Sequence, residues 1–257
     1  MSNYKLNLEH NGDPIAVIKT DKKKNAIVSI GQDSLNGLSD VKLKNKGELF
    51  QPITRGERLC TFISGQSGSG KSWYILNYAN EYHRMFPKRN IFLFSGLSKD
   101  SGSIDKIKGL QRITIDDEFM KNEFTAEEFL EGNGGALIIF DDIDGIPDKL
   151  IKAKIWGYLN NFLTTGRHNC IDVCVSMHLS CNKNETKVIL NECNNIVIFP
   201  MTVGNKINYL LKEYLGLTKS QIKKVMRTES RWVTICKTFP KTVITETECF
   251  VLRPDSD

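Results

Sequence analysis

The stretch Gly65-Gln66-Ser67-Gly68-Ser69-Gly70-Lys71-Ser72 decides how the chain folds. It fits G-x-x-x-x-G-K-[ST], the pattern of a loop whose backbone N–H groups surround a phosphate. Glycines at 65, 68 and 70 allow tight, positive-φ backbone conformations. Lys71 can bring an ammonium to the β- and γ-phosphate oxygens, and the Ser72 hydroxyl can ligate Mg²⁺. All eight residues are therefore predicted to bind a nucleoside triphosphate, with Ser72 as a ligand of its Mg²⁺.

The flanks of this loop match the structural context that the motif requires. Leu59–Ile63 is an apolar run that predicts a buried strand leading into the loop. Residues 73–85 are predicted to form a helix with Ile75, Ala79 and Tyr82 on one side. The N-terminus of such a helix carries partial positive charge, which favours a bound phosphate.

Composition indicates a folded, soluble chain. The 257 residues are 40% hydrophobic and 25% charged, and the net charge of +5 permits a nucleic-acid partner without demonstrating one. Seven cysteines, an odd number, favour reduced thiols and an intracellular protein. Cys170, Cys174, His178 and Cys181 are spread along a predicted strand, unlike a compact zinc knuckle. The polar N-terminus and the lack of a long apolar run argue against a membrane partner.

The first 50 residues differ in pattern from the rest. Residues 15–18 and 26–30 are short apolar runs separated by a charged turn, which predicts a β-hairpin, and residues 41–44 alternate like an exposed strand. We therefore expect a β-rich extension over 1–50 and a P-loop domain over 51–257.

A second apolar run ends in carboxylates. Residues 136–140 lead directly into Asp141 and Asp142. We expect this strand to lie next to the P-loop strand, where a carboxylate at its end reaches the Mg²⁺ shell. Asp141 is then the metal carboxylate and Asp142 the group that activates the attacking water. Asp144 is a weaker third candidate, and the choice between Asp142 and Asp144 stays open.

Residues 148–165 have the apolar spacing of an amphipathic helix, ended by Gly166 as a C′ glycine, and residues 171–178 form the next buried strand. Because active-site groups gather at the C-terminal ends of parallel strands, Ser176 and His178 are expected near the γ-phosphate. Arg167 falls at the opposite edge. A catalytic Arg167 must therefore serve a neighbouring subunit as a finger in trans. The alternative is a surface arginine that caps the helix C-terminus.

The remaining segments alternate between strands and helices. Strands are predicted at 90–95, 112–115 and 196–199, and helices at 185–193, 207–215 and 221–226, the last capped by Thr218 or Ser220. A capping box at Thr125–Glu128 predicts a short helix ended by Gly132 and Gly134. Residues 232–236 and 245–252 are predicted to pair as a closing hairpin. The basic residues around the 221–226 helix fit either a phosphate backbone or a solvated face.

The run from Thr165 to His178, with its Gly-Arg-His turn, and the Asp141-Asp142 pair resemble the genome-packaging ATPases of the FtsK–HerA superfamily, of the poxvirus, nucleocytoplasmic large DNA virus and virophage type. The resemblance covers about residues 55–200 and implies an α/β fold, a RecA-like P-loop NTPase of the additional-strand class. Its mostly parallel central sheet is flanked by helices, and the β extension adds to this core.

The same resemblance implies a function. It implies an ATP-driven motor that moves double-stranded DNA into a preformed capsid as a homo-oligomeric ring, typically a pentamer, with a capsid vertex or portal component as partner. The expected location is the host cytoplasm, a viral factory or the virion. It also implies roles for Lys71 and Ser72 on nucleotide and Mg²⁺, Asp141 on Mg²⁺, Asp142 in catalysis, Arg167 as the trans finger and His178 as the sensor.

Two other classes of function remain open from the sequence. A nucleotide or small-molecule kinase also needs a P-loop. A structural component of a capsid or replication complex could bind nucleotide without turning it over.

Overall fold

The computed structural model describes residues 4–20, 25–32, 36–44, 47–53, 58–96, 104–125, 127–129, 134–179, 181–182, 185–202 and 206–253. The chain forms two compact units. One unit is Arg55–Cys193, and the other combines Met1–Thr54 with Asn194–Asp257. The phosphate-binding motif lies in the first of these, which we call the nucleotide unit.

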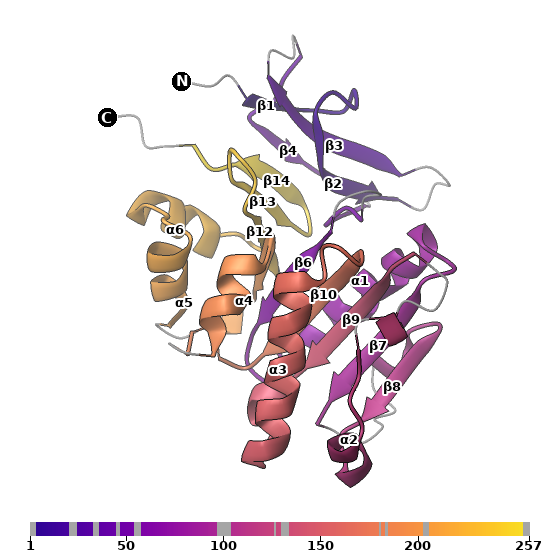
Figure 1. Cartoon of the computed structure of the whole chain (residues 1–257). Coiled ribbons are helices and arrows are strands. Elements are labelled where there is room, and N and C mark those ends of the chain that lie inside the picture. Colours follow the sequence, from indigo (N-terminus) through magenta and orange to yellow (C-terminus); the bar gives the residue numbers. More distant parts are fainter. Residues whose placement is uncertain are drawn as a thin grey trace. The chain divides into compact units, whose positions relative to one another are not determined.

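A parallel sheet forms the centre of the nucleotide unit (Figure 1). Its strands are β6 (Cys60–Ser64), β7 (Asn90–Ser95), β8 (Leu110–Thr114), β9 (Ala136–Asp141) and β10 (Ile171–Met177), in the order β6-β10-β9-β7-β8. The residues of β6, β9 and β10 are all buried, which explains why these segments are mostly apolar and do not alternate with polar residues.

The position of β10 corrects one expectation. The strand that ends at Asp141 was predicted to lie next to the P-loop strand, and this is wrong, because β10 pairs with both β6 and β9 and separates them. All seven residues of β10 are buried, so this strand suits the middle of a sheet covered on both faces.

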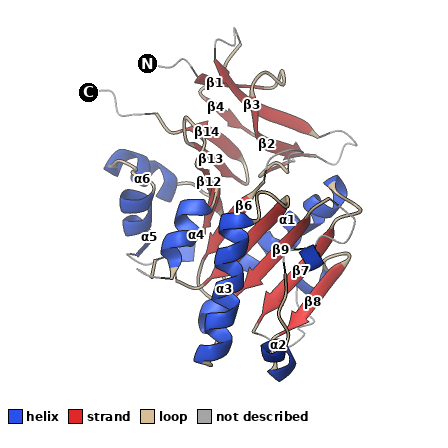
Figure 2. Cartoon of the chain, viewed as in Figure 1, coloured by secondary structure: helices blue, strands red, loops and turns tan. Residues whose placement is uncertain are grey.

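Helices cover both faces of this sheet. Figures 1 and 2 show α3 (Lys149–Thr165) across one face of the sheet and α1 (Lys71–Met85) on the other. The predicted side of α1, with Ile75, Ala79 and Tyr82, is buried. Two shorter helices complete the unit, α2 (Asp117–Lys121) and α4 (Thr186–Glu192). The fold class predicted from the sequence, a mostly parallel sheet flanked by helices, is confirmed.

Helix α3 begins as predicted and ends for an unexpected reason. The Asp148 side chain caps its N-terminus by accepting from the N–H groups of Leu150 and Ile151. At its C-terminus, Gly166 has φ −59° and not the positive φ of a C′ glycine. A Cβ at Gly166 would lie 2.4 Å from the oxygen of Phe162 and 3.2 Å from Nη2 of Arg58. Glycine is therefore required at position 166 because a side chain would clash with the oxygen of Phe162.

A cluster of aromatic rings fixes α3 on the sheet. Phe94 of β7 stacks on Phe140 of β9 with ring centroids 4.9 Å apart, and Phe162 of α3 meets the ring of Phe129 edge to face at 5.3 Å. Tyr158 of α3 also accepts a hydrogen bond from the N–H of Phe124 at 3.0 Å. Each aromatic pair of this kind stabilises a core by about 0.5–1.5 kcal/mol beyond its buried area.

The segment between β8 and β9 differs from expectation. Asp116 caps the short helix α2, which was not predicted, by accepting from the N–H groups of Glu118 and Phe119. The predicted capping-box helix is a single 3₁₀ turn at Glu127–Phe129. Ala126 and Gly132, two residues of that prediction, lie outside the described residues.

The second unit contains an antiparallel sheet of four strands in the order β1-β3-β2-β5. These are β1 (Tyr4–Asn7), β2 (Asp13–Lys19), β3 (Ala26–Gln32) and β5 (Glu48–Phe50). Antiparallel pairing of β2 with β3 confirms the predicted hairpin. The domain division into 1–50 and 51–257 stays a prediction.

The C-terminal part of this unit holds three further antiparallel strands beyond β11 (Asn195–Ile198), namely β12 (Val233–Cys236), β13 (Thr242–Thr245) and β14 (Glu248–Val251). The predicted hairpin between 232–236 and 245–252 is therefore wrong. The β-branched run of β13 lies between the two segments and pairs with both of them. β14 also pairs with β4 (Asp40–Lys42).

Two helices precede these strands. The first is α5 (Lys206–Tyr209), continued by a π-helical turn at Leu210–Tyr214, and Gly216 follows with φ +62°. The second is α6 (Lys219–Met226), which begins with a capping box between Thr218 and Gln221. None of the helices in the described part of the chain has the length and apolar character that a bilayer crossing requires.

Candidate nucleotide-binding site

The phosphate-binding motif forms a loop between β6 and α1. Gly68 and Gly70 have φ values of +75° and +107°, as the pattern predicts, whereas Gly65 does not have a positive φ. Gly65 instead continues the strand register, and its N–H donates to the oxygen of Met177 at 3.2 Å. Gly70 is the N-cap of α1 and supplies no side-chain cap. The first N–H groups of α1 are thus available to an anion.

Lys71 lies at the centre of the site. Its side chain is 5% exposed, and Nζ donates to the oxygen of Gly65 at 3.0 Å. Nζ also lies 3.4 Å from Oδ1 of Asp142 and 3.2 Å from Nδ1 of His178. The ammonium therefore joins the P-loop to the ends of β9 and β10.

Asp141 ends β9 beside two serines. It is 6% exposed and in register with Ser95 of β7 and Ser176 of β10. The Ser176 hydroxyl donates to Oδ1 of Asp141 at 2.5 Å. Burial raises the pKa of the Asp141 carboxyl, the hydrogen bond from Ser176 opposes that rise, and the neighbouring carboxylate of Asp142 adds to it. A cation bound here would favour the ionised carboxylate.

Asp142 holds its place through an uncommon backbone conformation. Its φ is +49°, in the left-handed region, and its N–H donates to the oxygen of Ser176 at 3.1 Å. Such a conformation costs a non-glycine residue about 1–2 kcal/mol. It places Oδ1 near Lys71 and Oδ2 3.2 Å from Nε2 of His178. Asp142 thus contacts both the P-loop lysine and the predicted sensor.

Asp144 contacts a different part of the same strand end. Its Oδ2 accepts from the N–H groups of His178 and Leu179, at 3.1 and 3.4 Å. Its Oδ1 is buried and has no hydrogen-bond partner among the described residues. Asp144 therefore holds the backbone that carries the His178 ring, whereas Asp142 contacts the ring itself.

A cavity of about 430 Å³ opens beside these groups. Ser67 of the P-loop, Asp142 and His178 line it, together with Gly96 and Ile146. This volume falls within the usual range of small-molecule sites.

The residues fit a triphosphate with a magnesium ion. The Ser69 hydroxyl is buried inside the loop without a partner among the described residues, so the loop has a donor to spare. Ser72 is half-buried directly after Lys71, and Asp141 is the most buried carboxylate of the site. Hydroxyl and carboxylate oxygens are the ligands that Mg²⁺ accepts. Ser72 and Asp141 are thus the pair suited to hold the ion.

Arg167 lies apart from these residues. It is exposed in the turn between α3 and β10, at the N-terminal end of β10, while His178 follows the C-terminal end of that strand. The length of β10 alone separates the two ends by about 20 Å. Within the part of the chain that the structure describes, the Arg167 side chain makes no hydrogen bond or ion pair.

Another arginine caps α3. Arg58 donates through Nε to the oxygen of Ile171 at 2.7 Å, through Nη1 to the oxygen of Leu163 at 2.9 Å, and through Nη2 to the oxygen of Phe162. The capping role that was the alternative for Arg167 thus belongs to Arg58, which the sequence interpretation missed. Only spatial neighbours more than a hundred residues away define this role. No local sequence signal could have found it.

Comparisons with known proteins give the fold and the family. No family model matches the chain. A crystal structure of B204, the DNA-packaging ATPase from Sulfolobus turreted icosahedral virus, is similar with a TM-score of 0.52 and 14% identity, over 73% of this chain and 97% of that chain. The genome-packaging NTPase B204 of Sulfolobus turreted icosahedral virus 2, in complex with ATP-gammaS, has a TM-score of 0.51 at 13% identity, over 74% and 98%.

This arrangement is a P-loop ATPase fold with a mostly parallel sheet flanked by helices, as the resemblance implied, and it is similar to the fold of B204. Uncharacterized protein V3 of Sputnik virophage is 35% identical over 237 residues, which is 91% of this chain and 94% of V3. The chain therefore belongs to the family of this virophage protein.

Proposed function

We propose that the protein is an ATP-hydrolysing motor that moves double-stranded DNA into a preformed viral capsid. The observation that carries the proposal is the contact of Lys71 with both Asp142 and His178, because it joins the P-loop to two strand ends that carry polar groups. A protein that only bound nucleotide would not need these groups. The fold shared with packaging NTPases and the virophage family support the same proposal.

The residues of the site have separate roles in this proposal. Gly65–Ser72 bind the phosphates through backbone N–H groups, and Lys71 moves from Asp142 to the β- and γ-phosphate oxygens when ATP enters. Asp142, released from Lys71, orients and deprotonates the attacking water, while His178 senses the γ-phosphate. When bound through Ser72 and Asp141, Mg²⁺ neutralises charge on the phosphates.

The site is completed by a second copy of the chain. Arg167 is exposed, unpaired within the described residues, and at the strand end opposite to the P-loop. An arginine in that position can stabilise the transition state only at a neighbouring P-loop. A closed ring, such as a pentamer, gives every P-loop one such arginine.

The partners follow from the same proposal. They are double-stranded DNA, further copies of the chain, and a component of the capsid vertex or portal, in the host cytoplasm, a viral factory or the virion. No membrane is part of the proposal.

The test is ATP turnover by the full chain with and without double-stranded DNA, alongside molecular mass in solution. The proposal predicts an oligomer whose turnover rises with DNA and is lost in Lys71→Ala. Phosphate transfer to a nucleoside or small molecule, without DNA stimulation, would instead establish the kinase alternative. Turnover that Lys71→Ala leaves unchanged would contradict the motor, and nucleotide binding without turnover would support a structural role.

A further inference from the structure

Helix α6 presents a basic surface that the nucleotide site does not explain. Lys219, Lys223, Lys224 and Arg227 are all exposed. Lys219, Lys223 and Arg227 follow one another at intervals of four residues, so they form a stripe along one side of the helix. At 1.5 Å per residue the stripe is about 12 Å long.

The helix dipole favours Lys223 and Arg227 near the C-terminus of α6, but it does not account for Lys219 or for the spacing of the stripe. Like charges at i and i+4 destabilise a helix by about 0.2–0.5 kcal/mol for each pair. The first turn of α6 contains no acidic residue, so Lys219 stands near the positive end of the helix dipole without compensation. An anionic partner would remove both of these unfavourable terms.

Some cations of the same unit are in ion pairs, and those of the stripe are not. Lys212 contacts Glu213 at 2.9 Å, and Arg231 contacts Glu246 at 2.7 Å. Among the described residues, Lys219, Lys223 and Arg227 make no ion pair. Their charges are therefore available to a ligand.

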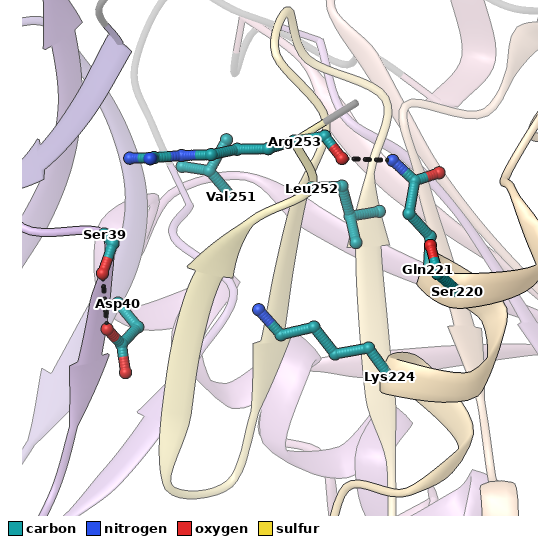
Figure 3. Close-up of a pocket in the computed structure, with 8 residues that line it drawn as sticks. All are labelled: Ser39, Asp40, Ser220, Gln221, Lys224, Val251, Leu252 and Arg253. Carbon is teal, nitrogen blue, oxygen red and sulfur yellow. Dashed lines mark hydrogen bonds between the residues drawn. The ribbon is translucent and has the colours of Figure 1, made fainter. Parts of the chain in front are cut away.

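A cavity of about 370 Å³ lies beside α6 and brings in two more cations (Figure 3). Lys224 of α6 and Arg253 line it, with the hydroxyls of Ser39 and Ser220 and the carboxylate of Asp40. Figure 3 shows Lys224 extending from α6 toward the strand that carries Val251, where Nζ lies 4.0 Å from the ring centre of Phe250. The cavity widens the positive surface beyond the stripe.

We propose that the α6 basic face, defined as Lys219, Lys223, Lys224, Arg227 and Arg253, binds the phosphate backbone of double-stranded DNA. The inference rests on the proposed function, because it names the surface that contacts the motor's substrate. DNA offers one negative charge about every 1.7 Å of its axis, so a stripe of about 12 Å faces several phosphates. Backbone contacts carry no sequence information and permit sliding, as a motor that packages a whole genome requires.

The test compares two triple variants of the full chain. The first, Lys219→Gln with Lys223→Gln and Arg227→Gln, neutralises the stripe and leaves Lys224, which packs on Phe250, in place. The control, Lys88→Gln with Lys121→Gln and Lys187→Gln, removes the same charge from exposed positions elsewhere. Affinity for a fluorescent duplex of about 30 base pairs is measured over a range of salt concentrations, and ATP turnover is measured without DNA.

The stripe variant is expected to bind the duplex at least about ten-fold more weakly at low salt. The slope of log affinity against log salt should fall by about 2.7, for three lost phosphate contacts. Turnover without DNA should be unchanged, and the control should bind DNA nearly as wild type. If the two triple variants had equal affinity for the duplex and equal salt dependence, the inference would be overturned. The proposed motor function would still be supported if DNA stimulated the ATP turnover of the wild type. If the stripe variant lost binding to phosphatidylserine vesicles but kept its binding to DNA, the inference would also be overturned.

Discussion

The Nζ atom of Lys71 lies 3.4 Å from Oδ1 of Asp142, with the lysine side chain 5% and the aspartate side chain 19% exposed. Both groups have predicted roles in hydrolysis, and each neutralises the other in this arrangement. A triphosphate that takes Lys71 also releases the Asp142 carboxylate. In the proposed mechanism, this ion pair couples nucleotide binding to the activation of Asp142 as the base.

Replacement of Asp142 by asparagine should separate binding from hydrolysis. The neutral amide holds Lys71 less tightly and removes a negative charge from the phosphate site, so affinity for a non-hydrolysable ATP analogue should stay equal or rise. Turnover should fall by about 10²–10⁴-fold, the usual contribution of a general base. Analogue titration and steady-state turnover measure the two effects. A variant that turned over normally would exclude Asp142 as the base.

Asp144→Ala should disturb the position of the predicted sensor, His178, and leave phosphate binding unchanged. It leaves the N–H groups of His178 and Leu179 without their carboxylate acceptor. The His178 ring then loses its fixed position near Asp142, and turnover should fall about ten-fold or more while analogue affinity changes little. If Asp144→Ala abolished turnover as fully as Asp142→Asn with His178 still in place by NMR, Asp144 would be the better candidate for the base.

Arg58→Ala should weaken the turn that presents Arg167. The guanidinium bonds three carbonyl oxygens at the end of α3 and the start of β10. Their loss should lower the free energy of unfolding by about 2–3 kcal/mol. Denaturant unfolding measures this loss. Arg58→Lys should recover only part of it, because an ammonium lacks the planar fork that reaches several carbonyls. Full stability of the alanine variant would show that the cap is dispensable.

Asp172 should make stability depend on pH. Burial raises the pKa of this carboxyl from 3.8 to about 6, although the N–H of Leu59 donates to it and Arg89 lies 3.7 Å away. The protonated form is thus favoured in the folded state. The protonated carboxyl contributes to the free energy of unfolding. This stabilisation is fully present below pH 3.8 and is lost as pH rises through about 6, a change of up to about 3 kcal/mol.

Asp172→Asn does not titrate and keeps an acceptor for Leu59. The stability of the variant relative to wild type, measured as the difference in free energy of unfolding, should therefore increase between about pH 4 and pH 7. Urea unfolding at both pH values measures this difference. A difference that is constant with pH, or that changes in the opposite direction, would contradict the assignment.

Most of the nucleotide unit could be predicted from the sequence because its signals are local. The P-loop, the apolar runs of β6, β9 and β10, and the Asp148 cap of α3 each lie within a few residues. The prediction for the last strands of the chain was wrong because β13 is short and lies between two more clearly apolar segments. The pairing of β13 depends on the positions of the turns, which the sequence pattern does not define.

The contacts of the candidate site were harder to predict. Asp142 and Asp144 are two residues apart and equally acidic, yet they contact different atoms of the same strand end, because Asp142 adopts φ +49°. Arg58 acts on residues more than a hundred positions away. Such roles depend on the folded backbone. The roles of Lys71, Asp142, Arg167 and His178 in catalysis stay predictions.

The central claim is that each P-loop needs Arg167 of a neighbouring copy, and mixing of two inactive variants tests it most directly. Lys71→Ala lacks a working P-loop but keeps the arginine, and Arg167→Ala has the reverse defect. In an equal mixture reassembled on DNA, about one quarter of the interfaces join an intact P-loop to an intact arginine, so turnover should reappear at about that fraction of the wild-type rate. Turnover that stays at the level of the separate variants, although mass measurements show mixed assemblies, would contradict the claim.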